Sequence, residues 1–205
     1  MSDDERPQAK TFANGLEFIE KNHQEDSWFL TIETFDPHEP FFTQQEYKDL
    51  YPHEYNGKFF DWPNYTAVTE GEEVLNHVKM EYAALISMCD AKLGLVQDAF
   101  DYNLWEDKML IVNTDHGFLG EHEWWGKLAP LYDEVANIPF FIFDLRSPKR
   151  DVREELCKTI DITQTILKYF GANIPADMMG KHPFHILLLK MLKQVLKLGK
   201  PLVQK

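Results

Sequence analysis

The chain has 205 residues, of which 44% are hydrophobic and 14% aromatic, and this is enough apolar material for one domain with a real core. That composition excludes a wholly disordered protein, and the formal net charge of −13 excludes a protein that wraps nucleic acid with a broad basic face. No apolar run approaches the roughly 20 residues that span a bilayer, so we expect no transmembrane segment.

The start of the chain and its two cysteines bear on the compartment. Met1–Lys10 is polar and charged, so we expect no secretory signal there. Cys89 and Cys157 lie far apart in the sequence and in no metal-type or redox-type pair, so we expect no disulfide framework. A reducing, cytoplasmic compartment is the default expectation, and the oligomeric state stays open.

Trp28–Thr34 is the first run of β-type residues, and its aromatic and β-branched side chains predict a buried strand. The next segment, Phe41–Glu70, is aromatic, contains prolines and is too long for a simple turn in a compact domain. Two interpretations of this segment are equally open: a packed excursion on the surface, or a loop that lines a substrate pocket.

Val78–Phe100 carries apolar residues at steps of three and four, which predicts an amphipathic helix lying on a sheet. Met109–Thr114 and Ile138–Phe143 are nearly continuous apolar runs, which are typical of buried, parallel strands. Asp161–Phe170 begins with a capping-type residue and stops before a glycine, which predicts a second helix. This alternation predicts an α/β fold, with a mainly parallel or mixed β-sheet flanked by helices.

The segment 181–205 differs from the rest, because it contains six lysines and no acidic residue. Its apolar residues could form one stripe of a basic amphipathic helix that binds a membrane surface or a partner. We favour a simpler interpretation, in which this tail is a non-native or out-of-register extension. The expected organisation is therefore one domain at 1–180, followed by a basic tail.

The stretch Asn113–Lys127 (NTDHGFLGEHEWWGK) directly follows an apolar strand, and ligands gather beyond the carboxyl ends of strands in open α/β sheets. Asp115 and His116 come first, and a carboxylate and an imidazole can together bind a divalent cation. Gly117 allows a sharp turn after them. As a bare dipeptide, Asp-His is more often a structural pair, and a single lysine is more often a solvated surface charge.

Taken together, these residues resemble the sulfatase family of the alkaline phosphatase superfamily. The family's late metal-ligand motif follows a strand and runs S/T-D-H/N-G, then G-E-H, then G-K. This sequence has all three parts, at 114–117, 120–122 and 126–127. Upstream, FDPHEPF at 35–41 is similar to the family's Pro-His-x-Pro element, and downstream DITQTILKYFGANIP at 161–175 is similar to its D-x-x-P-T segment, with Gln164 in place of the proline. The resemblance covers the region Trp28–Pro175.

The resemblance implies that Asp115 and His116 ligate a divalent metal, which is Ca²⁺ in most sulfatases, with Mn²⁺ or Mg²⁺ as alternatives. It implies that Lys127 holds a sulfate oxygen and that His38 contacts the sulfate or the leaving oxygen, because a metal, a lysine and an imidazolium stabilise the charge that develops there. His122 is as open to a structural role as to orienting a ligand. The implied partner is a small-molecule sulfate ester, and the sequence does not name its alcohol.

The sequence also departs from the family's pattern. Members begin with an acidic metal-binding strand and a C/S-x-P-x-R element, whose cysteine or serine becomes the formylglycine nucleophile, and neither is present here. Cys89 and Cys157 do not fit that element, and both fall on helical or apolar stretches, where a buried, inert thiol is the normal outcome. The loop DHGFLGEH is one residue shorter than the DHGxxLGEH spacing of the family. We therefore expect a domain fragment that holds half of the site and is inactive alone.

Three functions stay open on the sequence. The first is a sulfuric ester hydrolase (sulfatase) domain fragment. The second is a phosphodiester or phosphonate monoester hydrolase of the same superfamily, which would act on a phosphate or phosphonate ester, since histidine after the metal aspartate also occurs there. The third is a non-catalytic remnant or interaction module that uses the aromatic segment and the basic tail to bind a partner.

Overall fold

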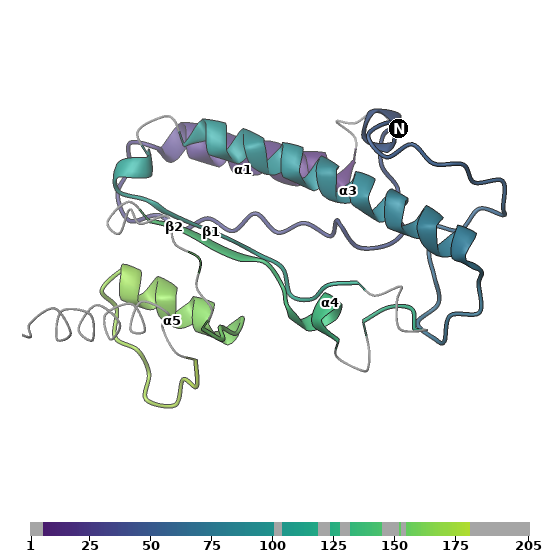
Figure 1. Ribbon diagram of the computed structural model, residues 1–205. Coiled ribbons are helices and arrows are strands. Elements are labelled where there is room, and N and C mark those ends of the chain that lie inside the picture. The colour runs from purple at the N-terminus through teal and green to yellow at the C-terminus, as the bar shows by residue number, and fades with distance from the viewer. Residues whose placement is uncertain are drawn as a thin grey trace, which may run out of the picture. The chain divides into compact units, whose positions relative to one another are not determined.

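A computed structural model describes the chain at residues 6–100, 104–118, 124–127, 132–144, 152 and 155–180. Its elements in chain order (Figure 1) are α1 (Pro7–Asn22), α2 (Gln45–Lys48), α3 (Glu72–Ala99), the 3₁₀ turn η2 (Leu104–Glu106), β1 (Met109–Asn113), α4 (Asp133–Ala136), β2 (Phe140–Asp144) and α5 (Ile160–Tyr169). The chain divides into two compact units, Met1–Pro148 and Lys149–Lys205.

Helix α1, which was not predicted, lies alongside α3 in the larger unit (Figure 1). Pro7 stands in its first turn, where the N–H that proline lacks would have no partner within the helix. Ile19 is buried and shares a core with Val96 of α3. Gly15 allows a close approach, since a Cβ at this position would lie 2.5 Å from Cδ1 of Ile32. Helix α1 therefore closes one side of the core of this unit.

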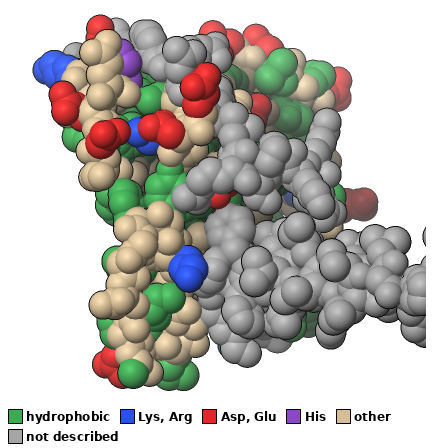
Figure 2. Space-filling view, turned by 90° about the vertical axis from the view of Figure 1, so that its left-hand side faces the viewer, with side chains coloured by type: hydrophobic (Ala, Val, Ile, Leu, Met, Phe, Trp, Pro, Cys, Tyr) green, Lys and Arg blue, Asp and Glu red, His purple; other side chains and the backbone are tan. Residues whose placement is uncertain are grey.

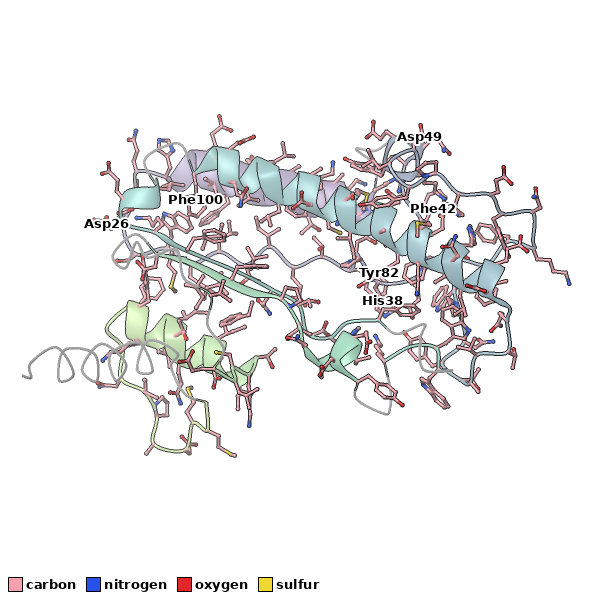
Figure 3. The ribbon with its side chains drawn as sticks, in the orientation of Figure 1. Asp26, His38, Phe42, Asp49, Tyr82 and Phe100 are labelled. Atoms are coloured by element: carbon pink, nitrogen blue, oxygen red, sulfur yellow. The ribbon has the colours of Figure 1, made fainter. Side chains whose placement is uncertain are left out.

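Helix α3 confirms the predicted amphipathic helix, although it begins earlier than predicted, at Glu72. Two acidic residues lie in its first turn, where the helix dipole favours negative charge. Figure 3 shows Tyr82 and Phe100 well apart along this helix, and each belongs to a different hydrophobic cluster. The buried members of the first cluster are Phe41, Val78, Leu85, Met88 and Trp125. Those of the second are Ile19, Val96, Phe100 and Leu104.

Strands β1 and β2 confirm the two later predicted strands and the α/β class, but not the expected strand direction. They pair antiparallel, with Ile111 opposite Ile142 at the centre of five residue pairs. They are half-buried rather than fully buried, and Phe141 of β2 remains 54% exposed. An apolar run indicates that a strand is covered, but it carries no information on direction, and the parallel expectation was therefore wrong for this pair.

The predicted strand Trp28–Thr34 forms an extended segment without strand hydrogen bonding, so this prediction was wrong. Its side chains still alternate between half-buried and exposed, as they would in a strand. Leu30 and Ile32 pack against the second cluster of α3, whereas Phe29 is 60% exposed. The β-type residues thus correctly indicated an extended backbone, although not a paired strand. A strand also needs a neighbouring backbone, and among the described residues none pairs with this segment.

Phe41–Glu70 is largely irregular, as predicted, and contains only the short helix α2 and an isolated bridge between Ala67 and Trp124. Its first residue, Phe41, is 1% exposed in the first cluster. The backbone N–H of Trp125 donates to the carbonyl oxygen of Thr66 at 2.8 Å. The end of this excursion is therefore joined to the segment that carries the predicted lysine.

In the smaller unit, α5 confirms the predicted second helix. Asp161 lies in its first turn, where Oδ2 accepts a hydrogen bond from the backbone N–H of Lys158 at 2.8 Å. Gln164, which stands where the family has proline, is buried and donates from Nε2 to the carbonyl oxygen of Met178 at 3.2 Å. It thereby ties the following loop to the helix. The basic tail at 181–205 lies outside the described residues.

The surface agrees with the composition. On the face drawn in Figure 2, acidic side chains are more prominent than lysine and arginine among the coloured residues, in line with the net charge of −13. Within the described part of the chain, no helix combines the length and the apolar character that a membrane span requires.

The role of α3 in the core can be tested with two leucines of the same helix. Leu85 is 0% exposed, so Leu85→Ala should lower the free energy of unfolding by about 2–5 kcal/mol, through lost burial and the cavity that remains. Leu95 is 45% exposed, and Leu95→Ala should lower it by less than about 1 kcal/mol. Urea unfolding followed by circular dichroism measures both values. Equal losses would contradict this placement of the core.

Candidate functional site

Three of the four residues predicted for the site lie together, because His38 and His116 both contact Lys127. Nζ of Lys127 lies 2.9 Å from Nε2 of His38 and 2.9 Å from Nε2 of His116. The two imidazole rings are nearly perpendicular, at 72°, with their centroids 6.2 Å apart. Figure 3 shows His38 beside α3, in the same region as Tyr82. Segments far apart in the sequence thus bring two imidazoles and an ammonium together.

The hydrogen bonds around the two imidazoles define where their protons lie. Nδ1 of His38 is 2.7 Å from the carbonyl oxygen of Glu39, and Nδ1 of His116 is 2.9 Å from that of Gly117. A carbonyl oxygen only accepts, so in both rings Nδ1 carries the proton and donates. The remaining nitrogen, Nε2, then offers a lone pair. Both lone pairs face Lys127, so the site is built to receive positive charge between the rings.

Asp115, the fourth predicted residue, lies at the edge of this group. Its Oδ1 is 3.7 Å from Nε2 of His116, and its side chain is 82% exposed. Ligand atoms that lie about 2.0–2.6 Å from one metal ion can have such a separation, and a carboxylate with an imidazole suits a divalent cation. Two ligands are nevertheless few, since Ca²⁺ takes about 6–8 oxygen atoms. The residues present thus fit part of a divalent metal site.

An aromatic contact network holds the three segments of the site in place. Phe41 comes three residues after His38, Phe118 two residues after His116, and Trp125 two residues before Lys127. The ring centroids of Phe41 and Phe118 are 5.0 Å apart, and those of Phe118 and Trp125 are 6.2 Å apart. All three rings pack into the first cluster of α3. Burial of these rings therefore fixes the backbone next to each functional side chain.

Two glycines allow the close approaches that the site requires. A Cβ on Gly117 would lie 1.9 Å from the carbonyl oxygen of Glu134, and the N–H of Gly117 donates to the carbonyl oxygen of Val135 at 2.9 Å. Gly126 has φ of 100°, which side chains disfavour, and a Cβ there would lie 2.5 Å from Cδ1 of Tyr65. These contacts pin the backbone after His116 and before Lys127.

Two residues beside the site were not predicted. Glu39 is only 2% exposed, its Oε2 lies 3.2 Å from Nδ1 of His38, and its Oε1 has no hydrogen-bond partner among the described residues. The ring of Tyr65 lies 5.8 Å from Nζ of Lys127. Burial, and then the Glu39 carboxylate, raise the pKa of the Tyr65 hydroxyl far above its usual range, so this phenol stays protonated. In the sequence Glu39 is an acidic residue between two nearby prolines, and this pattern does not by itself reveal that its side chain is buried.

The cysteines and the middle of the motif complete the comparison with the sequence. Cys89 is half-buried, and burial raises the pKa of its thiol to about 11, so it is the inert thiol that was expected. Cys157 is exposed rather than buried, which corrects the expectation for that residue. Both cysteines are free. Residues 120–122 lie outside the described residues, and with them His122, for which a structural and an orienting role were both open.

Comparison with known proteins gives matches over most of the chain. A family model described as Sulfatase matches residues 3–172. The Arylsulfatase of Clostridium perfringens is 26% identical over 185 residues, which cover 80% of this chain and 38% of that protein. The Multifunctional alkaline phosphatase superfamily protein PehA of Trinickia caryophylli is 25% identical over 211 residues, which cover 84% of this chain and 41% of that protein. The chain thus spans about two fifths of the length of these relatives.

A further curated relative and a solved structure match smaller parts of known proteins. The Uncharacterized sulfatase YidJ of Escherichia coli is 25% identical over 183 residues, covering 82% of this chain and 36% of that protein. A structure of BT4656 in complex with its substrate D-Glucosamine-2-N, 6-O-disulfate superposes with a TM-score of 0.45 and 22% identity. It covers 55% of this chain and 24% of that chain.

The glycine contact at the site gives a test of its packing. Gly117→Ala should lower the free energy of unfolding by about 1–3 kcal/mol, because the new methyl group collides with the backbone at Glu134. The control is Gly94→Ala in α3, where a Cβ meets nothing within 4 Å, and stability should stay constant or rise by up to about 1 kcal/mol. Urea unfolding of both variants measures the difference. If Gly117→Ala were as stable as Gly94→Ala, the close approach to α4 would be refuted.

Proposed function

Because this chain belongs to the sulfatase family, we propose that it carries one half of a metal-assisted sulfate ester hydrolase site. In this proposal Asp115 and His116 hold the divalent cation, and Lys127 and His38 contact the sulfate group. The observation that carries it is the contact of Lys127 with both imidazoles at 2.9 Å. The substrate is a small-molecule sulfate ester.

The donor inventory of Lys127 supports its role as an anion ligand. An ammonium group has three N–H donors, and two of them point to Nε2 of His38 and of His116. The third is left for an oxygen of the substrate, and a cation on Nε2 of His116 would release a second, because that nitrogen has a single lone pair. Since His38 fixes the direction of the ammonium before any anion arrives, little reorganisation of this contact is needed when a sulfate oxygen binds.

The donor set of Asp115 and His116 supports a divalent cation, with Ca²⁺ as the first candidate and Mn²⁺ or Mg²⁺ as alternatives. A bound cation would stabilise negative charge on the oxygens of the sulfate group. The exposed carboxylate of Asp115 is open to such an ion. Lys127 contacts the one lone-pair nitrogen of His116, so in this proposal the ammonium turns away from His116 when the ion binds. Further ligands have to come from groups other than these two side chains, which is why we describe half of a site.

The absence of a suitable nucleophile in this sequence supports the proposal that the chain has no sulfatase turnover by itself. No C/S-x-P-x-R element occurs in it. Burial raises the pKa of Cys89 to about 11, so its thiolate is scarce at neutral pH. Partial desolvation of its sulfur also raises the pKa of the Cys157 thiol, although the residue as a whole is exposed. Without a nucleophile the covalent step cannot take place.

A second candidate function is phosphodiester or phosphonate monoester hydrolysis. It is favoured by one observation, the similarity to a relative that is named a multifunctional member of the alkaline phosphatase superfamily. A lysine and two imidazoles can bind the oxygens of a tetrahedral phosphate group as readily as those of a sulfate group. Comparing sulfate with phosphate as the bound anion therefore separates the two candidates.

The anion role of Lys127 can be measured directly. Inorganic sulfate, titrated into the full chain with Ca²⁺ by isothermal calorimetry, should bind about ten- to a hundredfold more weakly to Lys127→Met, since a hydrogen bond to a charged group contributes about 1.5–3 kcal/mol. The matched control is Lys58→Met, at an exposed lysine of the irregular excursion, which should bind sulfate as the unmodified chain does. Equal affinity for Lys127→Met and Lys58→Met would contradict the proposed sulfate contact. Tighter binding of phosphate than of sulfate would favour the second candidate.

A turnover assay tests the missing nucleophile. The chain alone, supplied with an aryl sulfate and with Ca²⁺ or Mn²⁺, should release no more phenol than Asp115→Ala does, because no residue is available to form the covalent intermediate. Release above that background, measured by absorbance of the phenolate, would show that the chain contains a nucleophile of its own.

A further inference from the structure

A second group of metal-type side chains lies where α3 meets the irregular excursion. His77 and Glu81 stand one turn apart on α3, and His53 comes from the excursion. One ligand atom from each residue lies within 4.8 Å of the other two. Nε2 of His53 and Nδ1 of His77 are 2.8 Å apart. None of these residues belongs to the sulfate site proposed above.

The hydrogen bonds of His53 prepare one ring nitrogen for a ligand role. Its Nδ1 lies 2.9 Å from the carbonyl oxygen of Tyr51 and therefore carries the proton. Its Nε2 then presents a lone pair to Nδ1 of His77. A backbone carbonyl that holds the far nitrogen of an imidazole in this way is the usual support of a metal-binding histidine, because it fixes the tautomer and the ring orientation.

The remaining contacts hold the other two side chains in place. The ring of Tyr55 stacks on that of His77, with centroids 3.9 Å apart and planes 7° apart. Lys48 is paired with Oε2 of Glu81, and the Glu81 residue is 7% exposed. Burial, as the largest cause, lowers the pKa of His77, so its ring is neutral at pH 7 and has a lone pair to give. The group is thus partly buried and held by neighbouring contacts, and His77 has only to exchange its proton from Nδ1 to Nε2 before Nδ1 can bind a metal.

We propose that His53, His77 and Glu81 form a binding site for a first-row transition metal, with Zn²⁺ as the ion that the ligand set suits best. Two imidazoles and one carboxylate are borderline donors that favour zinc over calcium. They are also a common three-residue set that leaves a fourth position for water. The ion takes the place of the proton between the two rings, and that proton moves from Nδ1 to Nε2 of His77. Bound metal fastens the excursion to α3.

Zinc titration of the full chain tests this site. After removal of metals by EDTA and dialysis, Zn²⁺ affinity is measured by competition with Co²⁺, whose visible absorption reports the ligand set. Affinity should fall by at least about tenfold in His77→Ala and in Glu81→Gln, because even a supporting partner of a ligand contributes that much. Glu81→Gln keeps the size of the side chain. His53→Asn provides a third variant, and thermal melting in EDTA establishes that each variant is folded.

Two controls separate this site from other histidines and from the proposed sulfate site. His23→Ala removes an imidazole at the end of α1 and should keep the Zn²⁺ affinity of the unmodified chain. Asp115→Ala removes a proposed ligand of the other divalent-cation site, and it shows whether zinc binds there instead. On addition of Zn²⁺, ring nitrogen NMR signals of His53 and His77 should shift, and that of His23 should not. Unchanged affinity in the folded cluster variants overturns the proposal. So does a loss confined to Asp115→Ala, which would assign the zinc to the sulfate site.

Discussion

The candidate site depends on the packing of Phe41, Phe118 and Trp125 against α3. These rings sit two or three residues from His38, His116 and Lys127, so each functional side chain is anchored through the backbone beside it. Aromatic pairs in such contacts contribute about 0.5–1.5 kcal/mol each beyond their buried area. Hydrophobic burial therefore holds the functional side chains in place. The polar groups set the orientation of these side chains and contribute less to the stability of the fold.

Within that frame, the polar groups form a consistent hydrogen-bond network. Backbone carbonyls hold the protons of His38 and His116 on Nδ1, so both rings direct a lone pair to Lys127. Buried Glu39 lies behind His38, and a protonated Tyr65 lies near the ammonium. In a chain that is acidic overall, this arrangement places one ammonium group between two ring nitrogens.

The sequence predicted the elements whose signals are local. The apolar spacing of α3, the run before Asp115 and the glycine after α5 all correspond to observed elements. Properties that depend on distant neighbours were not predictable: the direction of β1 against β2 and the lack of a backbone partner for Trp28–Thr34. For the site, motif order indicated which residues meet. The burial of Glu39 depends on tertiary packing and was missed, whereas the spacing of His77 and Glu81, one helical turn apart, was a readable signal.

The attachment of Trp125 to the end of the excursion has an evolutionary consequence. Its backbone N–H bonds to Thr66, and its indole Nε1 donates to Oε2 of Glu70 at 2.8 Å. Insertions or deletions between Phe41 and Thr66 would therefore pull on the backbone of Trp125 and relocate the neighbouring lysine, whereas length changes just after α1 leave that anchor untouched. A change in the length of this loop alone would therefore move the ammonium of Lys127, with every residue of the motif kept.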